Sequence, residues 1–155
     1  MSDDQLNLDQ ILAKDIMSES VISVKPDMLI GQVAHLMLRS IVSGVPVVNE
    51  NKELVGIVTL TDLFILLDKV ARQVEQGVND ERNKSLHEHL EKTKNLPILE
   101  IMSKTIITIA PTTTLREMLD IVIKWHIHFL PVMQEGKIIG VIGRHDILNA
   151  TYVYG

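Results

Sequence analysis

The residues best suited to bind a ligand lie in the segment Gly56-Ile57-Val58-Thr59-Leu60-Thr61-Asp62. The hydroxyl of Thr59 stands three positions before the carboxylate of Asp62, where an apolar strand is expected to give way to a helix. A helix N-terminus presents unpaired backbone N–H groups and the positive end of the helix dipole, both of which favour a phosphate. A carboxylate there can accept both hydroxyls of a ribose. The segment therefore indicates nucleotide binding.

The same segment has a purely structural interpretation. Thr61 or Asp62 can act as a helix cap that satisfies the first-turn amides. Capping explains Asp62 and its counterpart Asp146 equally well, but it does not explain Thr59. Both interpretations stay open at this point.

Other polar residues are weaker candidates. His126 and His128 are two positions apart, as are His87 and His89, and two imidazoles without a third histidine make a poor zinc site. No metal site is predicted. The run Gly140-Val141-Ile142-Gly143 has the spacing of a nucleic-acid-binding loop, but here it ends a strand in an acidic protein.

Composition narrows the class of protein. The chain has 155 residues, of which 46% are hydrophobic and 3% aromatic, so its core must be aliphatic. It has no cysteine, which excludes disulfides, thiol catalysis, iron–sulfur clusters and cysteine-based zinc sites. A net charge of −5 argues against a broad nucleic-acid-binding surface. With no run long enough to span a bilayer and an acidic start unlike a signal peptide, a cytoplasmic protein without membrane insertion is expected.

Proline positions reveal an internal repeat. Pro26 and Pro46 recur as Pro111 and Pro131, an offset of 85 residues. Further segments follow the same offset, or 84 after one deletion in a turn: 16–18 with 101–103, 21–24 with 106–109, Gly56 with Gly140 and Asp62 with Asp146. The chain is therefore a tandem duplication of a unit of about 55 residues.

Each repeat predicts the same order of elements, β-α-β-β-α. An extended stretch (21–24 or 106–109) precedes a helix with apolar residues at helical spacing, namely Ile30, Val33, Ala34, Met37, Leu38 and Ile41 in the first repeat and Leu115, Met118, Leu119, Val122 and Ile123 in the second. Two short strands and a final helix near Asp62 or Asp146 follow, which makes the class mixed α/β (α+β). We expect repeats at 8–67 and 93–150, joined by a charged helical connection at 68–92 with a break near Gly77 and Asn79-Asp80.

The ordered motifs resemble a family. Each repeat has an Asp-Ile-Met-like opening (Asp15-Ile16-Met17; Glu100-Ile101-Met102), a proline after the first strand, a hydrophobic-Pro-Val strand, and a glycine six residues before a closing aspartate. The chain is similar to a pair of CBS domains, named after cystathionine β-synthase, over nearly its whole length. The resemblance implies two repeats packed with pseudo-twofold symmetry (a Bateman module), with two clefts for adenosyl ligands such as AMP, ADP, ATP, S-adenosylmethionine or a cyclic diadenylate.

Carried over by position, the resemblance assigns residues to both clefts. In cleft one, a ribose-binding group from the first repeat meets an adenine wall from the second: Thr59, Leu60, Thr61, Asp62, Ile107, Thr108, His128 and Phe129. Cleft two is the reverse: Ser23, Ser43, Gly44, Arg144, His145 and Asp146. Cleft two has Gly143 where cleft one has Thr59, so cleft one is the favoured site. Arg144 either supplies charge for a phosphate or points into solvent.

We therefore expect a regulatory nucleotide-binding module that acts in trans, forms a homodimer and needs no cofactor. The alternative is a dimerisation scaffold without a functional ligand, in which the aspartates are caps. An enzyme would require a general acid or base, which only His128 or His145 could supply near neutral pH, and neither has a visible orienting partner. An enzymatic function is not predicted.

Overall fold

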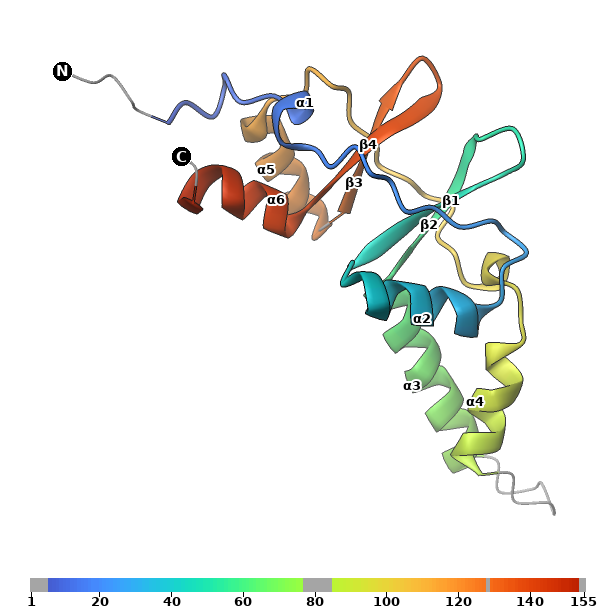
Figure 1. The fold of residues 1–155 in the computed structure, drawn as a ribbon. Coiled ribbons are helices and arrows are strands. Elements are labelled where there is room, and N and C mark those ends of the chain that lie inside the picture. The colour runs from blue at the N-terminus through green and yellow to red at the C-terminus, as the bar shows by residue number, and fades with distance from the viewer. Residues whose placement is uncertain (1–5, 77–84, 128, 154–155) are drawn as a thin grey trace. The chain divides into compact units, whose positions relative to one another are not determined.

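The computed structural model describes residues 6–76, 85–127 and 129–153 (Figure 1). Its helices and strands follow the order α1 (Ala13–Ile16), α2 (Ile30–Ser40), β1 (Gly44–Val48), β2 (Leu54–Thr59), α3 (Leu60–Gln76), α4 (Leu86–Lys94), η1 (Ile98–Glu100), α5 (Leu115–Trp125), β3 (Phe129–Gln134), β4 (Lys137–Gly143), α6 (Arg144–Leu148) and η2 (Asn149–Val153). The strands form two antiparallel hairpins, β1–β2 and β3–β4. The predicted mixed helix-and-strand class is confirmed. No helix in the described residues is long and apolar enough to span a membrane.

The chain divides into two compact units. Ser23–Ile106 forms the hairpin-1 unit, which contains β1 and β2. Met1–Ile22 together with Ile107–Gly155 forms the hairpin-2 unit, which contains β3 and β4. A repeat in the sequence is thus not the same as a unit in space, because the opening segment of each repeat folds with the hairpin of the other repeat.

Backbone hydrogen bonds fix this exchange of opening segments. In the hairpin-2 unit the amide of Ser18 donates to the carbonyl of Val141 at 2.9 Å, and the amide of Val141 donates back at 3.0 Å. In the hairpin-1 unit Ser103 and Ile57 form the same pair of bonds, at 2.8 and 2.9 Å. Each opening segment therefore covers one edge of a two-stranded hairpin that would otherwise expose unpaired backbone groups.

The first strand predicted for each repeat is shorter than expected. Of the stretches 21–24 and 106–109, only Val24 and Ile109 form β-bridges, each parallel to the middle of the neighbouring strand, β1 or β3. A proline follows two residues after each of these, and its lack of an N–H group prevents the ladder from continuing. The stretches therefore contribute one paired residue each at the second edge of each hairpin.

Each unit has its own aliphatic core, as the composition predicts. The buried side chains of the hairpin-1 unit are Val24, Ile30, Val33, Met37, Val45, Val47, Val58 and Ile98. Those of the hairpin-2 unit are Ala13, Ile109, Leu115, Met118, Leu130, Val132, Ile142 and Ile147. Ala13 and Ile98 come from the exchanged opening segments, so each core is completed by the other repeat.

The apolar helix faces are wider than the cores that they cover. Leu38 at the end of α2 is 71% exposed, and its counterpart Ile123 on α5 is 70% exposed. Ile41, which we expected on the buried face, caps α2 in the left-handed conformation and is 91% exposed. The helical spacing correctly indicated the helices, but these three positions lie beyond the reach of the small cores.

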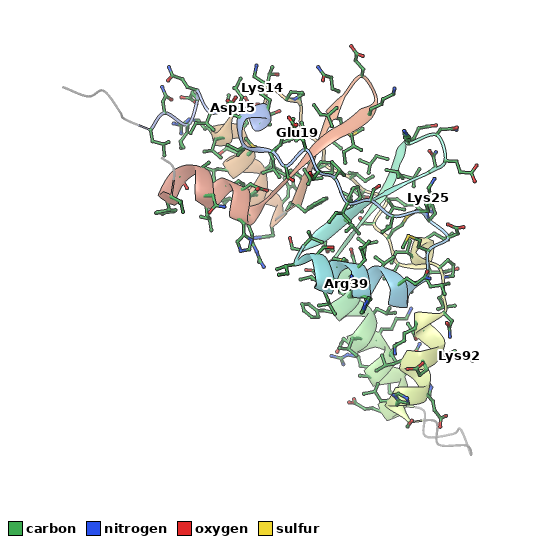
Figure 2. All side chains as sticks on the ribbon, viewed as in Figure 1. Lys14, Asp15, Glu19, Lys25, Arg39 and Lys92 are labelled. Carbon is green, nitrogen blue, oxygen red and sulfur yellow. The ribbon has the colours of Figure 1, made fainter. Side chains whose placement is uncertain are left out.

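The described parts of the charged connection are helical on both sides of residues 77–84. The last helix of the first repeat, α3, extends to Gln76, and α4 then packs against α3 and α2. The break expected near Gly77 and Asn79-Asp80 lies outside the described residues. Val70, at 4% exposed, is the buried contact of this extension, while the polar side chains of α4 lie on its surface (Figure 2).

Candidate functional site

The Thr59–Asp62 segment lies at the junction of β2 and α3 (Figure 1). Thr59 is the last residue of β2, and Asp62 is the third residue of α3. One carboxylate oxygen of Asp62, Oδ2, accepts the amide of Thr59 at 2.7 Å and its hydroxyl at 3.2 Å. Both residues are partly buried. The junction thus holds a carboxylate and a hydroxyl together on the first turn of a helix.

The second junction, between β4 and α6, has the same backbone geometry. Asp146 Oδ2 accepts the amide of Gly143 at 2.7 Å. At the start of α2, Gln32 accepts the amide of Leu29 in the same way at 3.0 Å. Because the third helical residue accepts the amide that precedes each of these helices, both aspartates cap a helix, but they do so at the residue before the helix and not at a first-turn amide as the capping interpretation expected.

Capping uses one oxygen of Asp62 and leaves two features unexplained. Within residues 6–76, 85–127 and 129–153, the other oxygen, Oδ1, accepts no hydrogen bond. The hydroxyl of Thr59 has no counterpart at Gly143, although the two amides are bonded alike. A free carboxylate oxygen next to a hydroxyl can accept the hydroxyls of a sugar, so the β2–α3 junction has the chemistry expected of a ribose-binding group.

The hairpin-1 unit also contains residues predicted for cleft two. Gly44 lies opposite Thr59 in the β1–β2 pairing. The carbonyl of Ser43 accepts the amide of Leu60 at 3.0 Å. Ser23 is the first residue of this unit. The structure therefore brings the ribose-binding group of cleft one next to two residues predicted for cleft two, Ser43 and Gly44.

The hairpin-2 unit shows the reciprocal arrangement. Buried Phe129 lies opposite Gly143 in the β3–β4 pairing, and Arg144 and His145 are exposed on the first turn of α6. Among the remaining wall residues of cleft one, Ile107 is partly buried and Thr108 is exposed, while Thr61 of the ribose-binding group is exposed in the other unit. His128 lies outside the described residues. Each unit thus carries half of each expected cleft, and the joining of these halves stays a prediction.

Sequence reasoning missed two methionines that position these segments. Met17 and Met102 belong to the opening motifs, and from the sequence we interpret both only as adaptable side chains that fill the core. In the structure their sulfurs lie against Gly140 and Gly56, respectively. The signal was present in the sequence, because both the methionine and the glycine recur at the repeat offset.

The described residues contain no group of three or more side chains suited to hold a metal ion. His87 and Glu91 on α4 lie 4.0 Å apart, one helical turn from each other, and provide two potential ligands at most. His126 is the left-handed C-cap of α5.

Two segments of the chain, one in each repeat, match the same family of known proteins. The family model of the CBS domain matches residues 13–69 and 98–152. The chain is 29% identical to uncharacterized protein MJ1426 of Methanocaldococcus jannaschii, over 94% of both sequences. Among solved structures, it is similar to protein MJ1225 of the same organism, with a TM-score of 0.75, 29% identity and coverage of 92% of this chain and 50% of that one. It also has the fold of CBSX2, solved in complex with AMP, with a TM-score of 0.69, 23% identity and coverage of 90% and 95%.

Proposed function

Because the chain belongs to the CBS-domain family, we propose that it is a regulatory module that binds an adenosyl nucleotide in cleft one. The carrying observation is the pairing of Thr59 and Asp62, in which one carboxylate oxygen is bonded to the junction and the other is available to a sugar. The relative CBSX2 has been solved with AMP, which makes AMP the first ligand to test. ADP, ATP, S-adenosylmethionine and a cyclic diadenylate share its adenosyl group.

The module acts on a separate partner in the cytoplasm and carries out no reaction of its own. Two CBS domains occupy most of the chain. The absence of cysteine suits a reducing compartment. Binding would regulate the partner by favouring one arrangement of the two units, to the extent that the ligand binds the two arrangements with different affinity.

The module is a homodimer that buries exposed apolar side chains on its helices. These are Leu38, Phe64 and Ile65 in the hairpin-1 unit, and Ile123, Trp125, Leu148 and Tyr152 in the hairpin-2 unit. Four of them form two pairs of equivalent positions in the repeats, Leu38 with Ile123 and Phe64 with Leu148. Large exposed apolar side chains that gather on a few helices are typical of interaction surfaces.

A ligand panel followed by thermal unfolding tests nucleotide binding. A ligand present at 100 times its dissociation constant stabilises the folded state by about 2.7 kcal/mol, which raises Tm by roughly 5–10 °C for a chain of this size. We expect such a shift with an adenosyl ligand, its loss in Asp62→Ala, and its retention in the matched variant Asp146→Ala. No shift with any adenosyl ligand, together with no nucleotide in the purified protein, would instead support the dimerisation scaffold, the second candidate function, in which Asp62 is only a cap.

A further inference from the structure

A methionine of each opening segment lies against a glycine of a hairpin. A β-carbon added to Gly56 would lie 2.5 Å from Met102 Sδ and 2.9 Å from its Cγ. A β-carbon added to Gly140 would meet Met17 at the same two distances. Contacts under 3.0 Å are essentially never made by real β-carbons, so any other residue at either glycine must displace the methionine. We call the two contacts the Gly56 latch and the Gly140 latch.

Each latch lies beside a backbone bridge. Next to Gly56, Ile57 exchanges two hydrogen bonds with Ser103, the residue after Met102. Next to Gly140, Val141 exchanges two with Ser18, the residue after Met17. A β-carbon at Gly56 would also lie 3.2 Å from the carbonyl oxygen of Ser103, and one at Gly140 would lie 3.1 Å from that of Ser18, so either substitution crowds an oxygen that accepts a hydrogen bond of the bridge.

Each bridge joins two chain segments that lead on to residues predicted for the same cleft. Two residues after Ile57, strand β2 reaches Thr59, and four residues after Ser103 the chain reaches Ile107. On the other hairpin, Val141 precedes Gly143 by two residues, and Ser18 precedes Ser23 by five. The ribose-binding group and the wall segment of a given cleft therefore start from the same anchored point.

We propose that the Gly56 latch orders the segment 103–109, which leads to the wall residues predicted for cleft one, and that the Gly140 latch orders the segment 18–24, which leads to Ser23 of cleft two. The proposal rests on the proposed function, since it concerns how the same clefts are assembled. Gly56 and Met102 are positioning residues that do not touch the ligand. A four-residue tether spans at most about 14 Å, so an anchored Ser103 confines Ile107, whereas a released Ser103 does not. Ligand affinity falls when a binding group must first be ordered.

Amide hydrogen exchange of the ligand-free protein tests the positioning. In Gly56→Ala we expect faster exchange in residues 103–109 and unchanged exchange in 18–24. The matched variant Gly140→Ala, which introduces the same contact in the other unit, should show the reverse. If Gly56→Ala folds poorly, Met102→Ala replaces it, because this variant removes the latch without adding a clash. It should give a smaller effect in the same segment, residues 103–109.

Calorimetric binding of AMP tests the consequence for cleft one. We expect Gly56→Ala to raise the AMP dissociation constant about tenfold, and Gly140→Ala to change it less than about twofold. The double variant Gly56→Ala/Met102→Ala removes the clash but leaves no methionine side chain to form the latch, so it should recover only part of the affinity. Recovery is also limited because the carbonyl oxygen of Ser103 still lies 3.2 Å from the added β-carbon.

The outcomes separate this inference from the proposed function. If wild type binds AMP and Asp62→Ala does not, but Gly56→Ala binds as wild type does, the latch proposal is wrong while the proposed function stands. Equal effects of the two glycine variants on both segments would also overturn it. If wild type binds no AMP, binding of this ligand is contradicted, and the exchange measurement alone decides whether each latch positions its own segment.

Discussion

Thr59 donates two hydrogen bonds to a single oxygen of Asp62, one from its amide at 2.7 Å and one from its hydroxyl at 3.2 Å. The amide bond is shared with Gly143 and Asp146 in the second repeat, whereas the hydroxyl bond is particular to the first. The amide bond is therefore common to both helix starts, whereas the hydroxyl bond is the feature that a ligand site in the first repeat would explain.

Replacement of Thr59 by valine should affect ligand binding more than folding. The variant keeps the amide bond to Asp62 and loses only a partly buried hydroxyl, so the free energy of unfolding should fall by about 0.5–1.5 kcal/mol in urea denaturation. AMP affinity should fall by about tenfold if the hydroxyl helps to hold the ribose-binding carboxylate. Asp62→Asn is the companion variant, because its amide oxygen can still accept the Thr59 amide while the charge is lost. Unchanged AMP affinity in both variants would assign this pair to capping alone.

Replacement of Ile41 by asparagine should stabilise the fold. Ile41 has φ of 54°, in the left-handed region that strongly disfavours a β-branched side chain, and its side chain is 91% exposed. Relief of this strain should raise the free energy of unfolding by about 1 kcal/mol, because asparagine tolerates the left-handed cap. His126→Asn, at the matching cap of α5, should gain less, since histidine is not β-branched. Urea denaturation of both variants at a protein concentration that fixes the oligomeric state measures the difference.

Charge placed on the exposed helix faces should break the homodimer. Leu38→Asp and Ile123→Asp each place a carboxylate where an exposed apolar side chain stands, so neither opens a cavity in a core. We expect wild type to sediment as a dimer in analytical ultracentrifugation and at least one of the variants as a monomer with an unchanged circular dichroism spectrum. Arg72→Asp on the outer part of α3, an exposed position in an ion pair with Asp68, is the control and should remain a dimer. A monomeric wild type would contradict the dimer.

The pKa of Glu91 should depend on Lys94. Lys94 Nζ donates to Glu91 Oε1 at 2.7 Å, and this hydrogen bond and the lysine charge lower the pKa of the Glu91 carboxyl. A carboxyl whose pKa is lowered on folding contributes stability above its unfolded pKa and loses it as pH falls through the folded value. Both groups lie on the surface, so the stabilisation is small and screened by salt. NMR titration should show a higher Glu91 pKa in Lys94→Ala; the same pKa in both proteins would show that the ion pair does not form in solution.

Much of the local structure could be predicted from the residues. The apolar spacing of 30–41 predicts α2, and the helix ends at Ser40. The polar turn after Val48 predicts the β1–β2 hairpin, which the structure contains. These features follow from interactions between near neighbours in the chain, and such interactions have a recognisable period or turn composition. Exposure of Leu38 was not predictable in this way, because periodicity indicates a face but not how much of that face a small core can cover.

By itself the sequence determined that the protein is a duplication with an aliphatic core, and that only the first repeat has a hydroxyl three residues before its closing aspartate. Only the tertiary structure decided which hairpin each opening segment joins. Met17 and Met102 each lie between an isoleucine and a serine, and Gly56 and Gly140 each lie between β-branched aliphatic residues, so the local sequence does not distinguish pairing within a repeat from pairing between repeats. The path of the connecting chain separates these alternatives, and it does so only when the whole chain is folded.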